Sequence, residues 1–279
     1  MAGRLFLCAT PLGNLEDITL RVLRVLRECD VIFAEDTRVS KVLLRAYDID
    51  KPIRSFHEQV EARRLAELRE LLAAGKTVAA MSDAGMPGIS DPGVELVRAA
   101  RAAGAAVEAL PGPSALLGAV VLSGFDCSRF RFDGFSPRKP GARAKYLAGL
   151  ANESACTVVY EAPGRVRALL DDIERVLGER RVFALREYTK KFEQQALGTA
   201  REVRAQIAWP ARGEFAIAIE GAVDDDRVIA VPEAVTQAIG ALVESGAGVG
   251  VVARAMHAAT GLPKNALYAL AQEAFDRRT

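Results

Sequence analysis

Short apolar runs alternate with helical periodicities along the first part of the chain. Runs bounded by turn residues predict strands at residues 4–10, 31–34, 77–81 and 106–110. Apolar residues at helical spacing predict helices near residues 18–29, 65–72, 93–103 and 115–122. Asp91 and Pro92 are the expected N-cap and first-turn proline of the third helix. Repeated strand–helix units favour a mostly parallel sheet with helices on both faces.

The pattern changes near residue 130, where the connections become longer. Strands are predicted at residues 130–135, 157–161, 181–186 and 215–220, with helices near 165–177 and 200–208. The acidic stretch at residues 224–226 resembles a linker, and the chain beyond it predicts only helices, the last two forming a helix-turn-helix-like unit. We therefore expect an α/β domain at residues 1–112, a second α/β domain at 113–223 and a helical domain at 224–279.

Composition narrows the class of protein. Hydrophobic residues make up 50% and charged residues 26% of the 279 residues, as in soluble globular proteins. Lys and Arg total 37 against 36 acidic residues, so an RNA surface would have to be a local patch. Four widely spaced cysteines and two histidines predict no metal site. The sequence shows no signal peptide and no apolar run of about 20 residues, so we expect a cytoplasmic protein.

Three Gly- and Pro-rich loops follow predicted strands of the first domain, at residues 10–14, 82–93 and 111–114. In open parallel sheets, ligands bind outside the carboxyl ends of the strands, and glycine lets the backbone approach them closely. One such loop could be an ordinary turn, but three at the same sheet edge favour a ligand site. Residues 246–250 also match GxGxG, but a predicted helix precedes them where a dinucleotide site needs a strand, so we expect a turn.

A basic segment at residues 135–146 is a candidate for binding RNA phosphates. It contains no acidic residue and carries Arg138, Lys139, Arg143 and Lys145. A flexible basic loop of this kind pairs with phosphates without reading sequence, whereas the alternative is a solvated surface loop.

Two further groups could carry chemistry. Residues 186–191 (Arg-Glu-Tyr-Thr-Lys-Lys) follow a predicted strand, where catalytic side chains often lie, although a salt-bridged surface turn fits equally well. His57, followed by Glu58, is a natural proton acceptor near neutral pH, but a lone histidine is more often structural.

Several short motifs spread over nearly the whole chain carry a more specific signal. They are TPLGNLEDIT at residues 10–19, AEDTR at 34–38, SDAGMPGISDPG at 82–93, LPGPSA at 110–115, GFSP at 134–137, YEAPGR at 160–165, REYTK at 186–190, GEF at 213–215 and KNALY at 264–268. In this order they resemble the tetrapyrrole-methylase superfamily and, within it, the ribosomal small subunit methyltransferase I family.

That resemblance implies a fold and a reaction. The fold would be two α/β domains of the class III methyltransferase type with S-adenosylmethionine in the cleft between them, plus a small C-terminal helical domain, in a homodimer. The reaction would be methylation of the ribose 2'-hydroxyl of a cytidine in the decoding region of 16S rRNA. The implied cofactor contacts are Pro11, Asp83, Ala84, Gly85, Met86, Ile89, Ser90, Pro111, Ala115, Tyr160, Ala162 and Ala216.

Two positions depart from the family pattern. The run FHEQVE at residues 56–61 lacks the second histidine of the family's His-Glu-His-Asn-Glu, and Gly85-Met86-Pro87 replaces Gly-Thr-Pro and so lacks its hydroxyl.

Methyl transfer requires the 2'-oxygen to lie in line with the methyl group at roughly 3–3.5 Å, and to lose its proton. The candidates for assisting that loss are Glu187, Lys190, Arg186 and His57, and Asp36 and Arg38 are candidates for orienting the target nucleotide. Two alternatives stay open: a corrinoid or porphyrin methyltransferase with the same cofactor site, and a non-enzymatic RNA- or DNA-binding protein that uses the helical tail.

Overall fold

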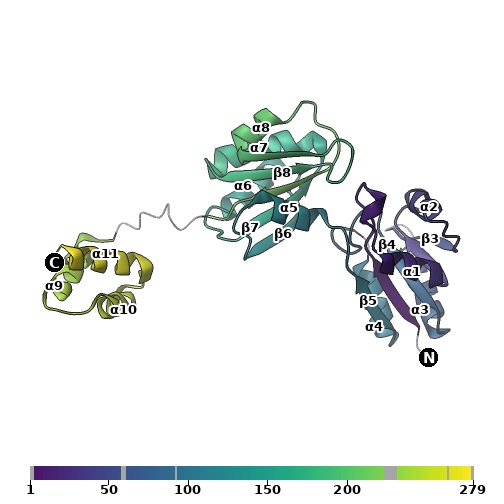
Figure 1. Ribbon diagram of the computed structural model, residues 1–279, viewed down its shortest axis with the longest axis horizontal. Coiled ribbons are helices and arrows are strands. Elements are labelled where there is room, and N and C mark those ends of the chain that lie inside the picture. Colours follow the sequence, from purple (N-terminus) through teal and green to yellow (C-terminus); the bar gives the residue numbers. More distant parts are fainter. Residues whose placement is uncertain (1–2, 58–60, 92, 223–230, 263, 278–279) are drawn as a thin grey trace. The chain divides into compact units, whose positions relative to one another are not determined.

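The described part of the chain is divided between two compact units. A computed structural model describes residues 3–57, 61–91, 93–222, 231–262 and 264–277. The units are Met1–Ala222, which carries two β-sheets with their helices, and Val223–Thr279, which carries helices (Figure 1). The expected linker at residues 224–226 lies outside the described residues. Within these ranges, no helix has the length and apolar character needed to cross a membrane.

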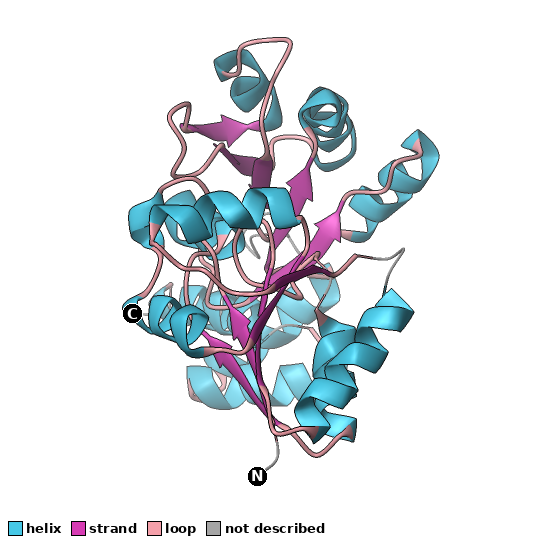
Figure 2. Cartoon of the chain, turned by 90° about the vertical axis from the view of Figure 1, so that its right-hand side faces the viewer, coloured by secondary structure: helices cyan, strands magenta, loops and turns pink. Residues whose placement is uncertain are grey.

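The first sheet is parallel, as the sequence predicts. Among the described residues it has five strands in the order β3-β2-β4-β1-β5. They are β1 (Arg4–Cys8), β2 (Val31–Ala34), β3 (Ile53–Ser55), β4 (Thr77–Met81) and β5 (Ala106–Leu110). The connecting helices are the 3-10 helix η1 (Leu15–Asp17), α1 (Leu20–Glu28), α2 (Thr37–Ala46), α3 (Glu61–Ala73) and α4 (Val94–Ala102). Figure 2 shows strands flanked by helices on both sides.

The second sheet is mixed, with described strands in the order β6-β7-β10-β8-β9. Only the β6–β7 pair is parallel among the described pairings of this sheet. Its strands are β6 (Phe130–Phe135), β7 (Cys156–Glu161), β8 (Arg181–Arg186), β9 (Gln194–Thr199) and β10 (Phe215–Ile219). Its helices are α5 (Ala115–Ser123), α6 (Pro140–Gly149), α7 (Pro163–Leu177) and α8 (Ala200–Gln206). Helix α5 packs on one face and α6–α8 pack on the other.

The C-terminal unit contains, in its described part, α9 (Glu233–Glu244), α10 (Val249–Thr260) and α11 (Lys264–Asp276). These helices share a small apolar core that includes Ile239, Val252 and Leu267. The GxGxG match falls at the turn between α9 and α10, so the prediction of a turn is confirmed.

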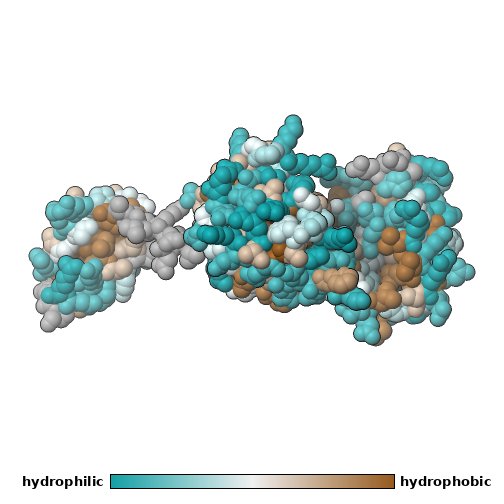
Figure 3. All heavy atoms as spheres, turned by 90° about the horizontal axis from the view of Figure 1, so that it is seen from above, coloured by the Kyte–Doolittle hydropathy of each residue, from teal (hydrophilic) through white to brown (hydrophobic). Residues whose placement is uncertain are grey.

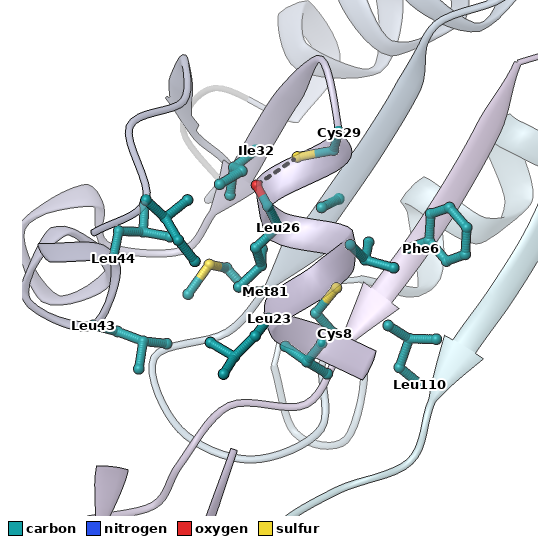
Figure 4. Packing of buried hydrophobic residues seen from close by; sticks show 14 of the residues in the cluster. Phe6, Cys8, Leu23, Leu26, Cys29, Ile32, Leu43, Leu44, Met81 and Leu110 are labelled. Carbon is teal, nitrogen blue, oxygen red and sulfur yellow. Dashed lines mark hydrogen bonds between the residues drawn. The ribbon is translucent and has the colours of Figure 1, made fainter. Parts of the chain in front are cut away.

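Apolar side chains gather between the layers. The face seen in Figure 3 is largely hydrophilic with some hydrophobic patches. Phe6 and Cys8 of β1 face α1 and α2 (Figure 4). Leu5 and Leu7 face α3 and α4, because successive strand residues point to opposite faces. Burying one such large side chain stabilises the fold by about 1.5–3 kcal/mol. This core holds the first sheet rigid, so the loops at its edge have a fixed base.

Some elements differ from the predictions. The expected flexible loop after β6 is wrong, because Pro140 starts helix α6, and proline is well suited to a helix's first position. The expected cap of α4 by Asp91 is wrong as well, since Gly93 is the N-cap residue, and Pro92 lies outside the described residues. The sequence patterns also missed α2, β3 and β9: β3 is only three residues long, and β9 is a polar edge strand.

Candidate functional site

The loops that follow β1 and β4 are joined at the carboxyl edge of the first sheet. Thr10 and Gly85 exchange two backbone hydrogen bonds, Thr10 N to Gly85 O at 2.8 Å and Gly85 N to Thr10 O at 3.0 Å. The Thr10 hydroxyl also donates to Ser82 O at 3.1 Å. Gly85 has φ +84°, a conformation that favours glycine, and an added Cβ would lie 3.2 Å from Leu12. The glycine therefore lets the two loops close on each other.

A cavity of about 420 Å³ opens at this edge, within the range of small-molecule sites. Side chains from both sheets of the first unit line it. From the first sheet's loops and α5 come Leu12, Glu35, Asp83, Ala84, Gly85, Met86, Ile89, Ser90, Asp91, Ser114 and Ala115. From the second sheet and its loops come Phe135, Tyr160, Glu161, Ala162, Pro163, Leu185, Glu187, Tyr188, Lys190, Glu214, Phe215 and Ala216.

Most of the predicted cofactor residues meet in this cavity. The lining includes Asp83, Ala84, Gly85, Met86, Ile89, Ser90, Ala115, Tyr160, Ala162 and Ala216. Of the predicted set, Pro11 and Pro111 are described by the structure but are not among the lining residues. The sequence thus located the residues, although their contact with a cofactor stays a prediction.

One wall of the cavity is acidic. Burial, reinforced by the charge of Asp83, raises the pKa of Glu35, and burial raises the pKa of Asp83 as well. Burial and the charge of Glu35 raise the pKa of Asp91 to about 6. A cation between these carboxylates would reduce the repulsion between their negative charges. This wall therefore suits a positively charged ligand. Among the described residues, no cluster of three or more His, Cys, Asp or Glu side chains could hold a metal ion.

A turn at residues 187–190, three of whose residues line the cavity, has unusual backbone geometry. Glu187 has φ +48° and Thr189 has φ +65°, which non-glycine residues rarely adopt. Backbone bonds hold the turn, with Glu187 N donating to Glu214 O at 2.9 Å and Lys190 N donating to Glu187 O at 2.9 Å. Such strain persists only where the surroundings enforce it, and it is concentrated at functional sites.

Glycines from separate parts of the first unit pack against this turn. A Cβ at Gly13 would collide with Lys190, and one at Gly118 would lie 2.5 Å from Tyr188 Cε1. A Cβ at Gly213 would lie 2.6 Å from Glu187 Oε1. Each position therefore excludes a side chain, and the turn is fixed from several directions.

Lys190 and Glu187 form a charged pair inside the cavity. Lys190 Nζ donates to Glu187 Oε1 at 3.0 Å and to Glu214 Oε2 at 2.9 Å, while Glu214 N donates to Glu187 Oε1 at 3.0 Å. Burial alone would lower the pKa of Lys190, but the bonds to Glu214 and Glu187 outweigh it and raise that pKa. Burial would raise the pKa of Glu187, but hydrogen bonds from Glu214 and Lys190 lower it. Both groups are therefore charged at neutral pH, and the Lys190 ammonium is a hydrogen-bond donor that keeps its proton.

The other two predicted catalytic residues lie apart from the cavity lining. Arg186 Nε donates to Arg212 O at 2.7 Å and Nη1 donates to Gln194 at 3.3 Å, which ties the guanidinium to neighbouring strands and loops. His57 follows β3 and is half-buried, but it is not among the described lining residues, and its neighbour Glu58 lies outside the described residues.

The predicted RNA-binding residues separate into two groups. Arg138, Lys139 and Lys145 are exposed. The Arg143 side chain is only 7% exposed and donates to Asp172 at 2.7 Å, so its assignment to phosphate binding is corrected to a structural ion pair.

Asp36 and Arg38 pair with each other. Asp36 caps α2 by accepting from Arg38 N at 2.8 Å, and the two side chains form an ion pair at 2.6 Å. The hydrogen bond from the Arg38 side chain lowers the pKa of Asp36 to about 2.

Sequence reasoning missed several lining residues. Glu35 directly follows β2 at the sheet edge, and Asp91, Phe135 and Tyr188 stand inside segments that the motifs already included. Position at a strand end was the available signal for Glu35. Glu214 lies in the GEF motif at residues 213–215, but its contact with Lys190 depends on the pairing of β10 with β8, which the motif does not indicate.

Comparison with known proteins gives consistent relatives. Residues 4–204 match the family of tetrapyrrole (corrin/porphyrin) methylases. The chain is 48% identical over 200 residues to the ribosomal RNA small subunit methyltransferase I of Thermotoga maritima, covering 72% of this chain and 90% of that protein. It is 40% identical over 270 residues to the protein of the same name from Xylella fastidiosa, covering 95% and 98%.

Solved structures share the fold at lower sequence identity. The methyltransferase CobJ superposes with a TM-score of 0.59 at 21% identity, covering 79% of this chain and 95% of that one. The cobalt precorrin-4 methyltransferase CbiF superposes with a TM-score of 0.60 at 16% identity, covering 78% and 94%. The predicted fold is therefore confirmed.

Proposed function

We propose a specific reaction for this chain, which belongs to the ribosomal RNA small subunit methyltransferase I family within the tetrapyrrole methylases. It methylates the ribose 2'-hydroxyl of a cytidine in the decoding region of 16S rRNA. S-adenosylmethionine is the proposed methyl donor. Small ribosomal subunits or their 16S rRNA are the proposed partner, and we expect the protein in the cytoplasm.

The observation that carries the proposal is the acidic cavity at the carboxyl edge of the first sheet. S-adenosylmethionine, when bound, supplies an electrophilic methyl group on a positively charged sulfur. Glu35, Asp83 and Asp91 supply the negative charge that such a cation requires. The same lining also contains apolar and backbone groups, including Gly85 and Ala216. The residues therefore fit this donor, and we assign its contacts to the predicted residues that line the cavity.

For the acceptor, we propose that Lys190 acts on the 2'-oxygen. Its ammonium is held by Glu187 and Glu214 and keeps its proton at neutral pH. It can therefore donate a hydrogen bond to the 2'-oxygen as that oxygen takes up the methyl group and passes its proton to solvent water, which is the usual role of a fixed cation at a developing oxyanion. Glu187 positions that ammonium, and Arg186 supports the turn.

On the RNA side, we propose that Arg138, Lys139 and Lys145 contact phosphates, since they are exposed on one segment next to a lining strand. We propose that Arg38, whose side chain is 89% exposed, helps to orient the nucleotide while Asp36 holds it in place.

We also propose a homodimer. Helix α5 has no charged residue and exposes Leu117 and Val121, which is typical of a helix that packs against a further surface. Sedimentation of the wild type and of Val121→Asp tests this: a dimer that the substitution turns into a monomer supports it, and a wild-type monomer contradicts it.

The test is methyl transfer from labelled S-adenosylmethionine to small subunits purified from cells that lack this protein, followed by nucleoside analysis. Label on a cytidine ribose supports the proposal, and Lys190→Met should then lower kcat while leaving donor affinity within a few-fold. Donor binding without any label on subunits or on free 16S rRNA contradicts it. A tetrapyrrole titration then tests the corrinoid or porphyrin alternative.

A further inference from the structure

Phe135 is an exposed aromatic side chain at the mouth of the cavity. It is 56% exposed, whereas the neighbouring lining residues Phe215 and Ala216 are each 3% exposed. Its ring meets Tyr160 edge-on, with centroids 6.1 Å apart and planes at 69°. An edge-on contact covers at most one face of a ring, so Phe135 keeps a face available beside the cavity.

A β-bulge puts the ring there. In β6, Phe132 pairs with Val158 and Phe135 pairs with Tyr160, so three steps along β6 match two along β7. Residues three apart in a regular strand point to opposite faces, yet Phe132 and Phe135 both pack against Tyr160. Gly134 has φ +67° and absorbs the extra residue. Bulges next to active sites commonly redirect a side chain, and this one brings Phe135 to the cavity.

The strand is anchored immediately after Phe135. The Ser136 hydroxyl is buried and bonds to the Glu161 carboxylate. Arg165 Nη2 donates to Ser136 O at 2.5 Å and pairs with Glu161 at 3.2 Å. The backbone that carries the ring is thus held in place by buried polar contacts.

We propose that Phe135 is the surface on which the unpaired base of the target nucleotide stacks when its ribose enters the cavity. This inference rests on the proposed RNA methylation and specifies the form of the substrate: a nucleotide turned out of its helix or already single-stranded. Single-stranded RNA is recognised by stacking its bases on aromatic rings while nearby cations hold the phosphates. Arg138 and Lys139 follow Phe135 by three and four residues and are exposed.

Two substitutions separate stacking from filling of space. Phe135→Trp keeps an aromatic face, and Phe135→Leu keeps apolar bulk without one. Phe130→Ala is the matched control, since Phe130 is 42% exposed at the other end of β6 and is not among the described lining residues. The measurements are kcat and KM for small subunits, and donor affinity by calorimetry.

We expect Phe135→Leu to lower kcat/KM by roughly 5- to 100-fold, mainly through KM for RNA, the usual loss for one stacked base. Phe135→Trp and Phe130→Ala should stay near wild type, and donor affinity should be unchanged in all three. An unchanged kcat/KM in Phe135→Leu overturns the inference. An equal loss of donor affinity in Phe135→Leu also overturns the inference, because the ring would then belong to the donor site. A changed oligomeric state of this variant overturns it as well.

A second measurement keeps this inference separate from the proposed function. A single-stranded RNA oligonucleotide carrying 2-aminopurine loses fluorescence when the labelled base stacks. Quenching by the wild type but not by Phe135→Leu supports the stacking surface even if no methyl group reaches rRNA. Equal quenching by both, or none by either, overturns it, whatever the outcome of the methylation assay.

Discussion

Gly213→Ala tests whether the turn at residues 187–190 is held by the packing described above. Gly213 has φ +80°, so alanine costs about 1–2 kcal/mol in backbone strain alone. Its Cβ would also lie 2.6 Å from Glu187 Oε1, which forces that carboxylate to move. The carboxylate then loses its bonds to Glu214 N and to Lys190 Nζ, both 3.0 Å long.

The size of the second effect follows from burial. Hydrogen bonds to charged groups contribute about 1.5–3 kcal/mol, and we take the lower value because the side chains of Glu187 and Lys190 are 18% and 30% exposed. With two such bonds lost and the backbone strain added, Gly213→Ala should lower the free energy of unfolding by roughly 4–5 kcal/mol. Gly124→Ala is the matched control: Gly124 has φ +66° and nothing within 4 Å of an added Cβ, so it should lose only the strain.

The assay is urea unfolding followed by circular dichroism, with methyl transfer measured on the folded variants. Turnover of Gly213→Ala should fall at least about tenfold, because an ammonium displaced by a fraction of an ångström no longer meets the reacting oxygen. In a Glu187→Ala background the carboxylate that the new Cβ would strike is absent. Gly213→Ala should then lower the free energy of unfolding only by the backbone strain. Equal destabilisation by Gly213→Ala and Gly124→Ala, or an extra loss that survives in the Glu187→Ala background, would refute the reasoning.

Further substitutions test other groups. The pKa of Asp91 is raised to about 6 because the folded protein favours the protonated carboxyl. The resulting contribution to the free energy of unfolding is present below about pH 4 and is lost as pH rises through about 6. Asp91→Asn should therefore stabilise the fold by about 1 kcal/mol at pH 8, after allowing for solvent exposure, and by nothing near pH 4 in urea unfolding. Arg143→Ala removes one of the two arginine partners of Asp172 and leaves Arg175, so it should cost about 2 kcal/mol, and a loss under about 1 kcal/mol contradicts that structural role. Arg138→Glu should leave stability unchanged and reduce the salt dependence of rRNA binding, and an unaltered slope contradicts phosphate contact. Thr199→Ala removes the capping box of α8 and should lower the thermal midpoint, at a cost of about 1 kcal/mol.

The sequence by itself determined most of the strand–helix order of the first unit, the helical C-terminal unit and the loops that line the cavity. These are properties of local periodicity and turn chemistry: an apolar run such as residues 77–81 has few alternatives to a buried strand, and glycine-rich segments end it. Local signals failed where they were ambiguous. The Pro-Gly pair at residues 140–141 indicates a loop or a helix start equally well, and the contact of Arg143 with Asp172 decides for the helix.

Only the tertiary structure decided how the site works. Lys190 keeps its proton because sheet pairing brings Glu214 to it, and Phe135 reaches the cavity because a bulge shifts the register against β7. The acidic wall has raised pKa values because Glu35 and Asp91, far apart in the chain, are buried together. Charge state, burial and side-chain direction depend on neighbours that are distant in sequence. The local pattern of residues therefore cannot predict them.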